Sequence, residues 1–158
     1  MSKKVIIIMT EPEPHKSGFL RRSEKDAILQ KGLPGIEDHE IHAVQIGYSD
    51  VSNGIIDSYE KYRENQKLPE CGIISGEEKL VNFNEEVTTQ EIMATIYSMF
   101  NRLQPNNNCL AVARPEIVKR LLKQAALGNS KVPEPWSIIK IIEKKQGVLE
   151  FHRVNQNA

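Results

Sequence analysis

The sequence contains no long hydrophobic run. Its longest uninterrupted apolar stretches, residues 5–9 (VIIIM) and 109–113 (CLAVA), have five residues each, whereas a helix that crosses a membrane needs about 20. Two lysines precede the first stretch, as in a secretory signal peptide, but the acidic residue Glu11 follows too soon for the apolar part of such a signal. We therefore expect no membrane partner and no cleaved leader.

Cysteine is scarce, with only Cys71 and Cys109 in the chain. Two cysteines are too few for a disulfide framework, and there is no Cys-x-x-Cys pair. Each lies beside or within an apolar stretch, which is typical of a small buried hydrophobe in a reducing compartment. Neither has a neighbouring histidine or a known nucleophile signature. We expect a cytoplasmic protein without a catalytic cysteine.

An excess of charge of one sign is also missing. The chain has 21 Lys and Arg against 21 Asp and Glu, so its formal net charge is zero. A general nucleic-acid-binding protein needs a surplus of Lys and Arg to displace the counterions of the phosphates. No basic run is interleaved with aromatic residues such as Tyr97 and Trp136, so these favour core or interface positions over base stacking. We expect no nucleic-acid partner, although a local basic pocket is compatible with this balance.

The chain of 158 residues matches one domain at the usual size of about 100–200 residues. No linker divides it, so we expect a single domain over 1–158 with flexible tails at 1–3 and 155–158. Strand-like stretches alternate with helical patterns along this domain. The expected strands are residues 5–8, 42–48, 72–75, 109–113, 137–142 and 148–154.

Boundary residues mark four expected helices. Ser23 is expected to cap a helix that runs to about residue 31, and Ser52 or Asn53 to cap a second helix that runs to about residue 66. Thr88 begins a third helix with the capping box Thr-Thr-Gln-Glu. Pro115 fits the first position of a fourth helix, where its missing N–H costs nothing.

The alternation of strands and helices predicts an α/β fold, a three-layer α/β/α sandwich with a mostly parallel central sheet. The last two strands, joined near Gly147, are expected to form a C-terminal antiparallel hairpin. Ligands of such sheets bind beyond the carboxyl ends of the strands. Two positions therefore matter most for function: residues 9–11, after the first strand, and Arg114, after the strand 109–113.

Arg114 is a candidate contact for an anion. It lies between a strand end and a helix start, where backbone N–H groups and the helix dipole favour negative charge. Its guanidinium adds a fork that fits a phosphate or a carboxylate. The alternative is a surface arginine that pairs with Glu11 or Glu116.

A basic loop follows the first strand and contains His15, Arg21 and Arg22. We consider that this loop closes over the anion contact, with a solvated charged loop as the alternative. A metal site is suggested by residues 37–42 (EDHEIH), but this stretch leads into a strand and lacks the His-Glu-x-x-His order. We expect neither a metal nor a cofactor.

The order of these segments resembles the histidine phosphatase (phosphoglycerate-mutase-like) superfamily in its small single-domain form. That family begins with a strand that runs into Arg-His-Gly, where this chain has Met9, Thr10 and Glu11. Residues 28–32 (ILQKG) lie where the family has Leu-Thr-x-x-Gly. Residues 110–114 (LAVAR) lie where its second histidine ends a strand.

The resemblance implies a degenerate member that lacks both catalytic histidines. The family nucleophile falls on Thr10, the arginine of its first motif on Met9 and its second histidine on Arg114. Residues 49–53 also lack the arginine of the family's turn motif. Without the ring nitrogen that carries the phosphoryl group, the covalent route of the family has no first step. A pseudo-phosphatase is expected.

Three functions are compatible with the sequence. The first is a catalytically inactive domain that binds a protein partner, a second copy of itself, or a small phosphorylated or anionic ligand at the strand ends. The second is an active hydrolase or transferase of another class that uses acidic residues such as Glu11 or Glu86. The third is a purely structural or regulatory interaction protein. The expected ligand-binding residues of the first function are Thr10, Glu11, His15, Arg21, Arg22, Glu86 and Arg114.

Overall fold

The computed structural model describes residues 3–45, 49–74, 88–125 and 133–154. The strands are β1 (Lys4–Thr10), β2 (Ala43–Gln45), β3 (Gly72–Ile74), β4 (Asn108–Ala113), β5 (Ile138–Lys145) and β6 (Val148–Val154). The helices are α1 (Arg22–Lys31), α2 (Asp50–Asn65), α4 (Thr89–Arg102) and α5 (Pro115–Gln124), with a 3₁₀ turn η1 (Asp38–Glu40).

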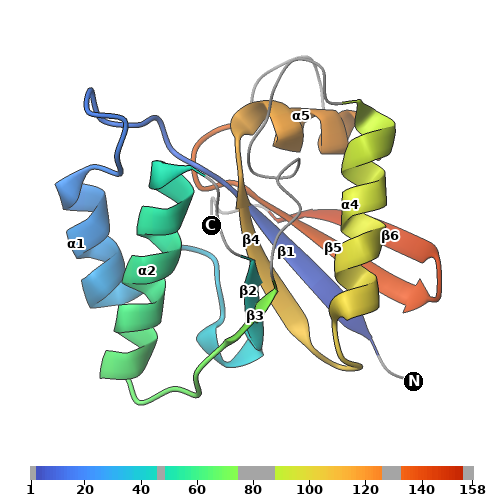
Figure 1. The fold of residues 1–158 in the computed structure, drawn as a ribbon, viewed down its shortest axis with the longest axis horizontal. Coiled ribbons are helices and arrows are strands. Elements are labelled where there is room, and N and C mark those ends of the chain that lie inside the picture. Colours follow the sequence, from blue (N-terminus) through green and yellow to red (C-terminus); the bar gives the residue numbers. More distant parts are fainter. Residues whose placement is uncertain (1–2, 46–48, 75–87, 126–132, 155–158) are drawn as a thin grey trace.

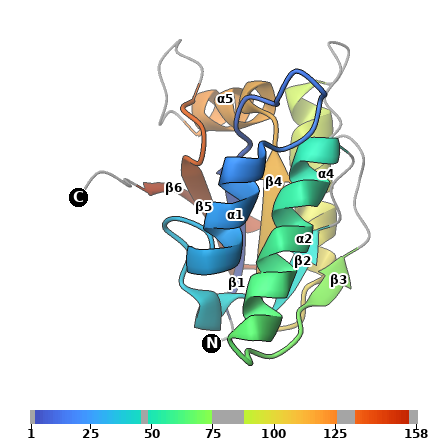
Figure 2. The same cartoon turned by 90° about the vertical axis from the view of Figure 1, so that its left-hand side faces the viewer.

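The strands form one sheet in the order β3-β2-β4-β1-β5-β6. β1, β2, β3 and β4 are parallel, whereas β5 is antiparallel to β1 and β6 is antiparallel to β5. Helices α1 and α2 cover one face of the sheet, and α4 and α5 cover the other (Figure 1). Figure 2 shows α1 and α2 side by side in front of the sheet. The predicted three-layer α/β fold with a C-terminal antiparallel hairpin is confirmed.

The central strand β1 contributes to the cores on both faces of the sheet. Ile6 and Ile8 pack in the cluster that includes α4 and α5, whereas Ile7 and Met9 pack in the cluster that includes α1 and α2. Successive side chains of a strand point to opposite faces, so a strand covered on both sides has to be apolar throughout. This explains the uninterrupted apolar run at residues 5–9.

The structure corrects the starts of two helices. α1 begins at Arg22 after the extended residue Arg21, which makes no side-chain capping bond, so the prediction of Ser23 as the cap is wrong. α2 begins at Asp50, and Ser49 is its N-cap. The Ser49 hydroxyl accepts from the Ser52 N–H (3.0 Å), and the Ser52 hydroxyl accepts from the Ser49 N–H (3.3 Å). This reciprocal pair stabilises the earlier start, because it satisfies two backbone donors at once.

The other two helices begin where the sequence predicts. The Thr88 hydroxyl caps α4 by accepting from the Glu91 N–H at 3.1 Å, and Pro115 is the first residue of α5. Gly147 turns the β5–β6 hairpin with a left-handed φ of 83°. Of the expected tails, residues 1–2 and 155–158 lie outside the described residues. Across the described residues, none of the helices combines the length and the apolar character that a membrane span requires.

Candidate functional site

The carboxyl ends of β1 and β4 meet at one edge of the sheet. Thr10 pairs in register with Ala113, and the Glu11 N–H donates to the Ala113 carbonyl at 2.9 Å. Glu11 therefore lies next to Arg114, the residue after β4. The two strand ends that the sequence analysis singled out therefore lie at one edge of the sheet.

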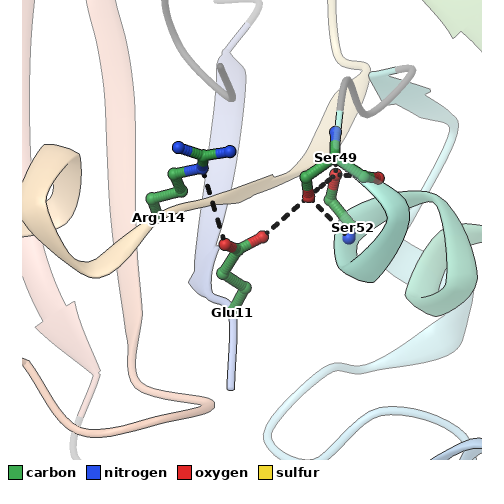
Figure 3. A network of polar contacts seen from close by, with 4 residues as sticks. All are labelled: Glu11, Ser49, Ser52 and Arg114. Carbon is green, nitrogen blue, oxygen red and sulfur yellow. Dashed lines mark hydrogen bonds and ion pairs between the residues drawn. The ribbon is translucent and has the colours of Figure 1, made fainter. Parts of the chain in front are cut away.

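Three segments that are distant in the sequence meet at Glu11 (Figure 3). The Glu11 Oε1 atom lies 3.8 Å from the Arg114 Nε atom. The Ser49 hydroxyl, at the start of α2, donates to the other carboxylate oxygen at 3.0 Å. The Ser49 and Ser52 hydroxyls are themselves 2.8 Å apart. The carboxylate thus joins the end of β1, the start of α2 and the start of α5.

Burial and charge act against each other at Glu11. The residue is only 8% exposed, and this burial raises the pKa of its carboxyl. The hydrogen bond from Ser49 and the charge of Arg114 oppose that rise without cancelling it. The Arg114 side chain is 38% exposed, so the edge presents a solvent-facing cation beside a buried acid.

Arg114 is also the N-cap of α5. Its backbone is extended, and its carbonyl accepts from the N–H groups of Ile117 and Val118. Arg114 lies between β4 and the first turn of α5 because Pro115 follows it. A proline favours an extended residue before it and the start of a helix after it. The guanidinium and the positive end of the helix dipole therefore lie at one place, where both favour an anion.

Thr10 points away from this network. Its side chain has no exposed surface, and its Oγ1 atom lies 2.8 Å from the Ser137 Oγ atom. The alternation along β1 explains the difference, because Thr10 and Glu11 project to opposite faces of the sheet. The structure brings Thr10 together with Ser137, the residue before β5, and its proposed contact with a ligand stays a prediction.

The basic loop lies at the protein surface. His15 is exposed, and its Nδ1 atom lies 3.1 Å from the Ser17 hydroxyl. Arg21 and Arg22 are exposed at the start of α1. Their roles as ligand contacts stay predictions, and Glu86 lies outside the described residues. Of the expected site residues that the structure describes, Glu11 and Arg114 are brought together as an ion pair.

Two residues of the network were not predicted as site residues. Ser49 carries a readable signal, since serine is a preferred N-cap residue, and Ser52 stands where a capping box usually has Glu or Gln. The histidine considered for metal binding, His42, has a structural contact instead, because its Nδ1 atom accepts from the Asn108 N–H at 3.1 Å. The described residues contain no group of three or more His, Cys, Asp or Glu that is suited to a metal ion.

The cysteines behave as apolar groups. Cys109 is fully buried in β4, and burial raises its pKa to about 12. Cys71 is half-buried, so the prediction of a buried residue is too strong for this position. Burial raises the pKa of its thiol as well. A thiol that stays protonated is a poor nucleophile.

Comparison with known proteins supports the fold alone. No family model matches the chain, and no match was found among curated proteins. The fold is similar to the crystal structures of phosphoglycerate mutases from Bacillus anthracis str. Sterne (TM-score 0.60, 13% identity, 97% of this chain and 93% of that chain) and Plasmodium falciparum (0.57, 12%, 99% and 92%). Bacillus stearothermophilus YhfR is also similar (0.58, 13%, 97% and 98%). The chain therefore has a fold similar to that of phosphoglycerate mutase.

Proposed function

We propose that this chain is a non-catalytic domain of phosphoglycerate-mutase-like fold that binds a small phosphorylated or other anionic ligand at the carboxyl edge of its sheet. Arg114 is the residue that contacts the anion. Neither Cys71 nor Cys109 is in a disulfide, which fits a protein of the reducing cytoplasm.

The burial of Thr10 carries the non-catalytic part of the proposal. The family resemblance puts the nucleophile at this position, where the side chain has no exposed surface. A hydroxyl is a weak nucleophile unless a neighbouring base removes its proton, and the partner of Thr10 is another hydroxyl, that of Ser137. A substrate phosphate at the protein surface therefore meets no exposed Thr10 oxygen, and Thr10 is left out of the proposed anion contacts.

The position of Arg114 supports anion binding. Its guanidinium is partly exposed, and the first turn of α5 begins beside it. The 3.8 Å contact with Glu11 is longer than a strong charge-assisted hydrogen bond, which spans about 2.7–2.9 Å. A phosphate that makes two short contacts therefore competes well with the carboxylate for this arginine.

A turnover assay tests the non-catalytic part. We expect no hydrolysis of phosphohistidine, sugar phosphates or p-nitrophenyl phosphate above the rate without protein. The Thr10→Ala variant is the matched control, since it removes only the hydroxyl at the position implied by the resemblance. Robust hydrolysis that Thr10→Ala abolishes overturns the proposal.

The buried carboxyl of Glu11 favours a second candidate function, general acid catalysis by an enzyme of another class. A carboxyl with a raised pKa, held at a strand end, is a recurrent feature of active sites. This candidate predicts hydrolysis of a phosphate ester that Glu11→Gln abolishes and Thr10→Ala leaves intact. The same substrate panel, run with both variants, separates the two functions.

A further inference from the structure

β6 is the longer of the two edge strands of the sheet. It has seven residues and lies at one end of the sheet, whereas β3, at the other end, has three (Figure 1). Within the described part of the chain, β5 is the one strand that pairs with β6, so no strand pairs with the outward-facing N–H and C=O groups of β6. An edge of this kind can pair with a strand of another chain.

Apolar side chains lie partly exposed beside this edge. Leu149 and Phe151 are only partly buried, although both pack against the core beneath α4 and α5. Val148 is 54% exposed, and Tyr97, on α4, is 38% exposed. The Tyr97 hydroxyl lies 3.4 Å from the Gly147 carbonyl oxygen, at the turn of the hairpin. A strand that pairs with β6 would extend the apolar core at this end of the sheet.

The sequence of β6 is suited to antiparallel pairing with β6 of a second copy. Residues directly opposite each other in an antiparallel pair lie on the same face of the sheet, so a two-fold axis has to pass through one residue of the strand. Phe151 is the midpoint of β6, and an axis through it pairs all seven residues. Phe151 then lies opposite Phe151, Val148 opposite Val154, and Leu149 opposite Arg153. None of these three pairs brings like charges together.

The charged residues of the strand favour the same register. With the axis through Phe151, Glu150 of each copy lies opposite His152 of the other, and this pair occurs twice. Within one chain the Glu150 Oε1 atom lies 2.8 Å from the His152 Nε2 atom, and Glu150 also pairs with Lys144. The carboxylates therefore have cationic neighbours on both sides in the paired strands. An axis through Glu150 would instead place the two carboxylates opposite each other, which is unfavourable.

We propose that the chain forms a symmetric dimer in which two β6 strands pair antiparallel about Phe151 and join two six-stranded sheets into one. Backbone hydrogen bonds hold the strands together, and the alternation of Glu150 and His152 sets the register. Strands β1 and β5 separate β6 from β4, so the dimer leaves the Arg114 edge open in both copies. The proposal is independent of the function proposed for that edge.

Sedimentation velocity from about 5 µM to about 500 µM tests the dimer. We expect the mass to rise with concentration to twice the 18.0 kDa of one chain. His152→Glu places a carboxylate opposite Glu150 at two points and should weaken dimerisation by at least about tenfold. His152→Gln is the matched control, since it keeps an N–H donor at this position, and should change dimerisation by less than about threefold.

A mixture of two variants tests the register through charge. Glu150→Lys places a lysine opposite His152 and should also weaken dimerisation. In a mixture of Glu150→Lys and His152→Glu chains, opposite charges face each other at both positions. The mixture should therefore form a mixed dimer more tightly than either variant forms its own dimer.

Disulfide cross-linking tests the register through distance. The Cα atoms of residues opposite each other lie about 4.5–5.5 Å apart, which is within reach of a disulfide. Oxidised Phe151→Cys should therefore become a covalent dimer. Val148→Cys is the control, because position 148 is exposed but its two copies lie at opposite ends of the paired strands. It should cross-link no faster than the wild-type chain with its two native cysteines.

The proposal is overturned if the wild-type chain stays monomeric up to about 500 µM, where even a very weak association would be visible. It is also overturned if His152→Glu dimerises as tightly as His152→Gln, or if the mixture forms no mixed dimer. Melting curves followed by circular dichroism establish that each variant is folded. If Phe151→Cys does not fold, the mixture decides the register.

Discussion

Glu11 and Arg114 form an ion pair at the carboxyl edge of the sheet, with the Glu11 Oε1 atom 3.8 Å from the Arg114 Nε atom. The acid is buried, and the base faces the solvent. Glu11 therefore has two effects on the proposed function. It holds Arg114 at the edge, and it competes with an anionic ligand for the same guanidinium.

This competition predicts opposite effects of two substitutions on the binding of a sugar phosphate. Arg114→Gln removes the charged contact and should weaken binding by at least about tenfold. Glu11→Gln removes the competing negative charge and should strengthen binding several-fold. Isothermal titration calorimetry measures both affinities. Arg153→Gln, at an exposed position of β6, is the control, and an Arg114→Gln variant with unchanged affinity contradicts this role of Arg114.

The raised pKa of Glu11 predicts how stability depends on pH. The folded protein holds this proton more tightly than the unfolded chain, in which the pKa of the carboxyl is close to its ordinary value of 4.5. The free energy of unfolding should therefore fall as the pH rises from about 4.5 through the higher folded-state pKa. Urea denaturation from pH 4 to pH 8 measures this dependence. Glu11→Gln should flatten it, and identical pH profiles of the two proteins would contradict the assignment.

Gly32 ends α1 in a conformation and a space that only glycine fits. Its φ is 74°, and a Cβ atom there would lie 2.8 Å from the Tyr62 ring. Gly32→Ala should lower the free energy of unfolding by about 2–4 kcal/mol, from strain and overlap together. Gly147→Ala is the matched control, because Gly147 also has a positive φ but no atom within 4 Å of an added Cβ. Urea denaturation of both variants separates the two causes, and an equal loss contradicts the role of the Tyr62 contact.

Arg63 is a buried link between α2 and the segments around it. It is 4% exposed and donates to the backbone carbonyls of Asp38, Ile41 and Pro69. Arg63→Met should lower the free energy of unfolding by about 3–5 kcal/mol, because three carbonyls lose a charged donor. Thermal and urea denaturation measure this loss. Arg153→Met, at an exposed position, should stay within about 0.5 kcal/mol of the wild type, and an equally small effect at Arg63 would show that the link adds no stability.

The central strands of the sheet could be predicted because a strand that is buried on both faces is apolar throughout. Residues 5–9 and 109–113 are apolar without interruption, as the packing of β1 and β4 between two helical layers requires. Ligands of such sheets bind beyond the carboxyl ends of the strands, and this rule pointed to the positions of Glu11 and Arg114. Local signals also identified Thr88 and Pro115 at the helix starts.

Contacts between distant segments could not be predicted from local patterns. The burial of Thr10 depends on Ser137, which directly precedes β5, a strand that pairs with β1 only in the folded sheet. Arg63 lies in a helix whose apolar spacing is readable, but the carbonyls that draw its side chain inward belong to other segments. The left-handed backbone of Trp136 likewise depends on a hydrogen bond to Thr10.

The most direct test of the proposed function is a ³¹P NMR time course of glucose 6-phosphate with the intact chain, because one spectrum reports binding and hydrolysis together. We predict that the phosphomonoester signal broadens or shifts when protein is added, that Arg114→Gln removes this effect, and that no signal of inorganic phosphate grows. Growth of the inorganic phosphate signal, or a phosphomonoester signal that does not respond to the protein, would contradict a non-catalytic anion-binding edge.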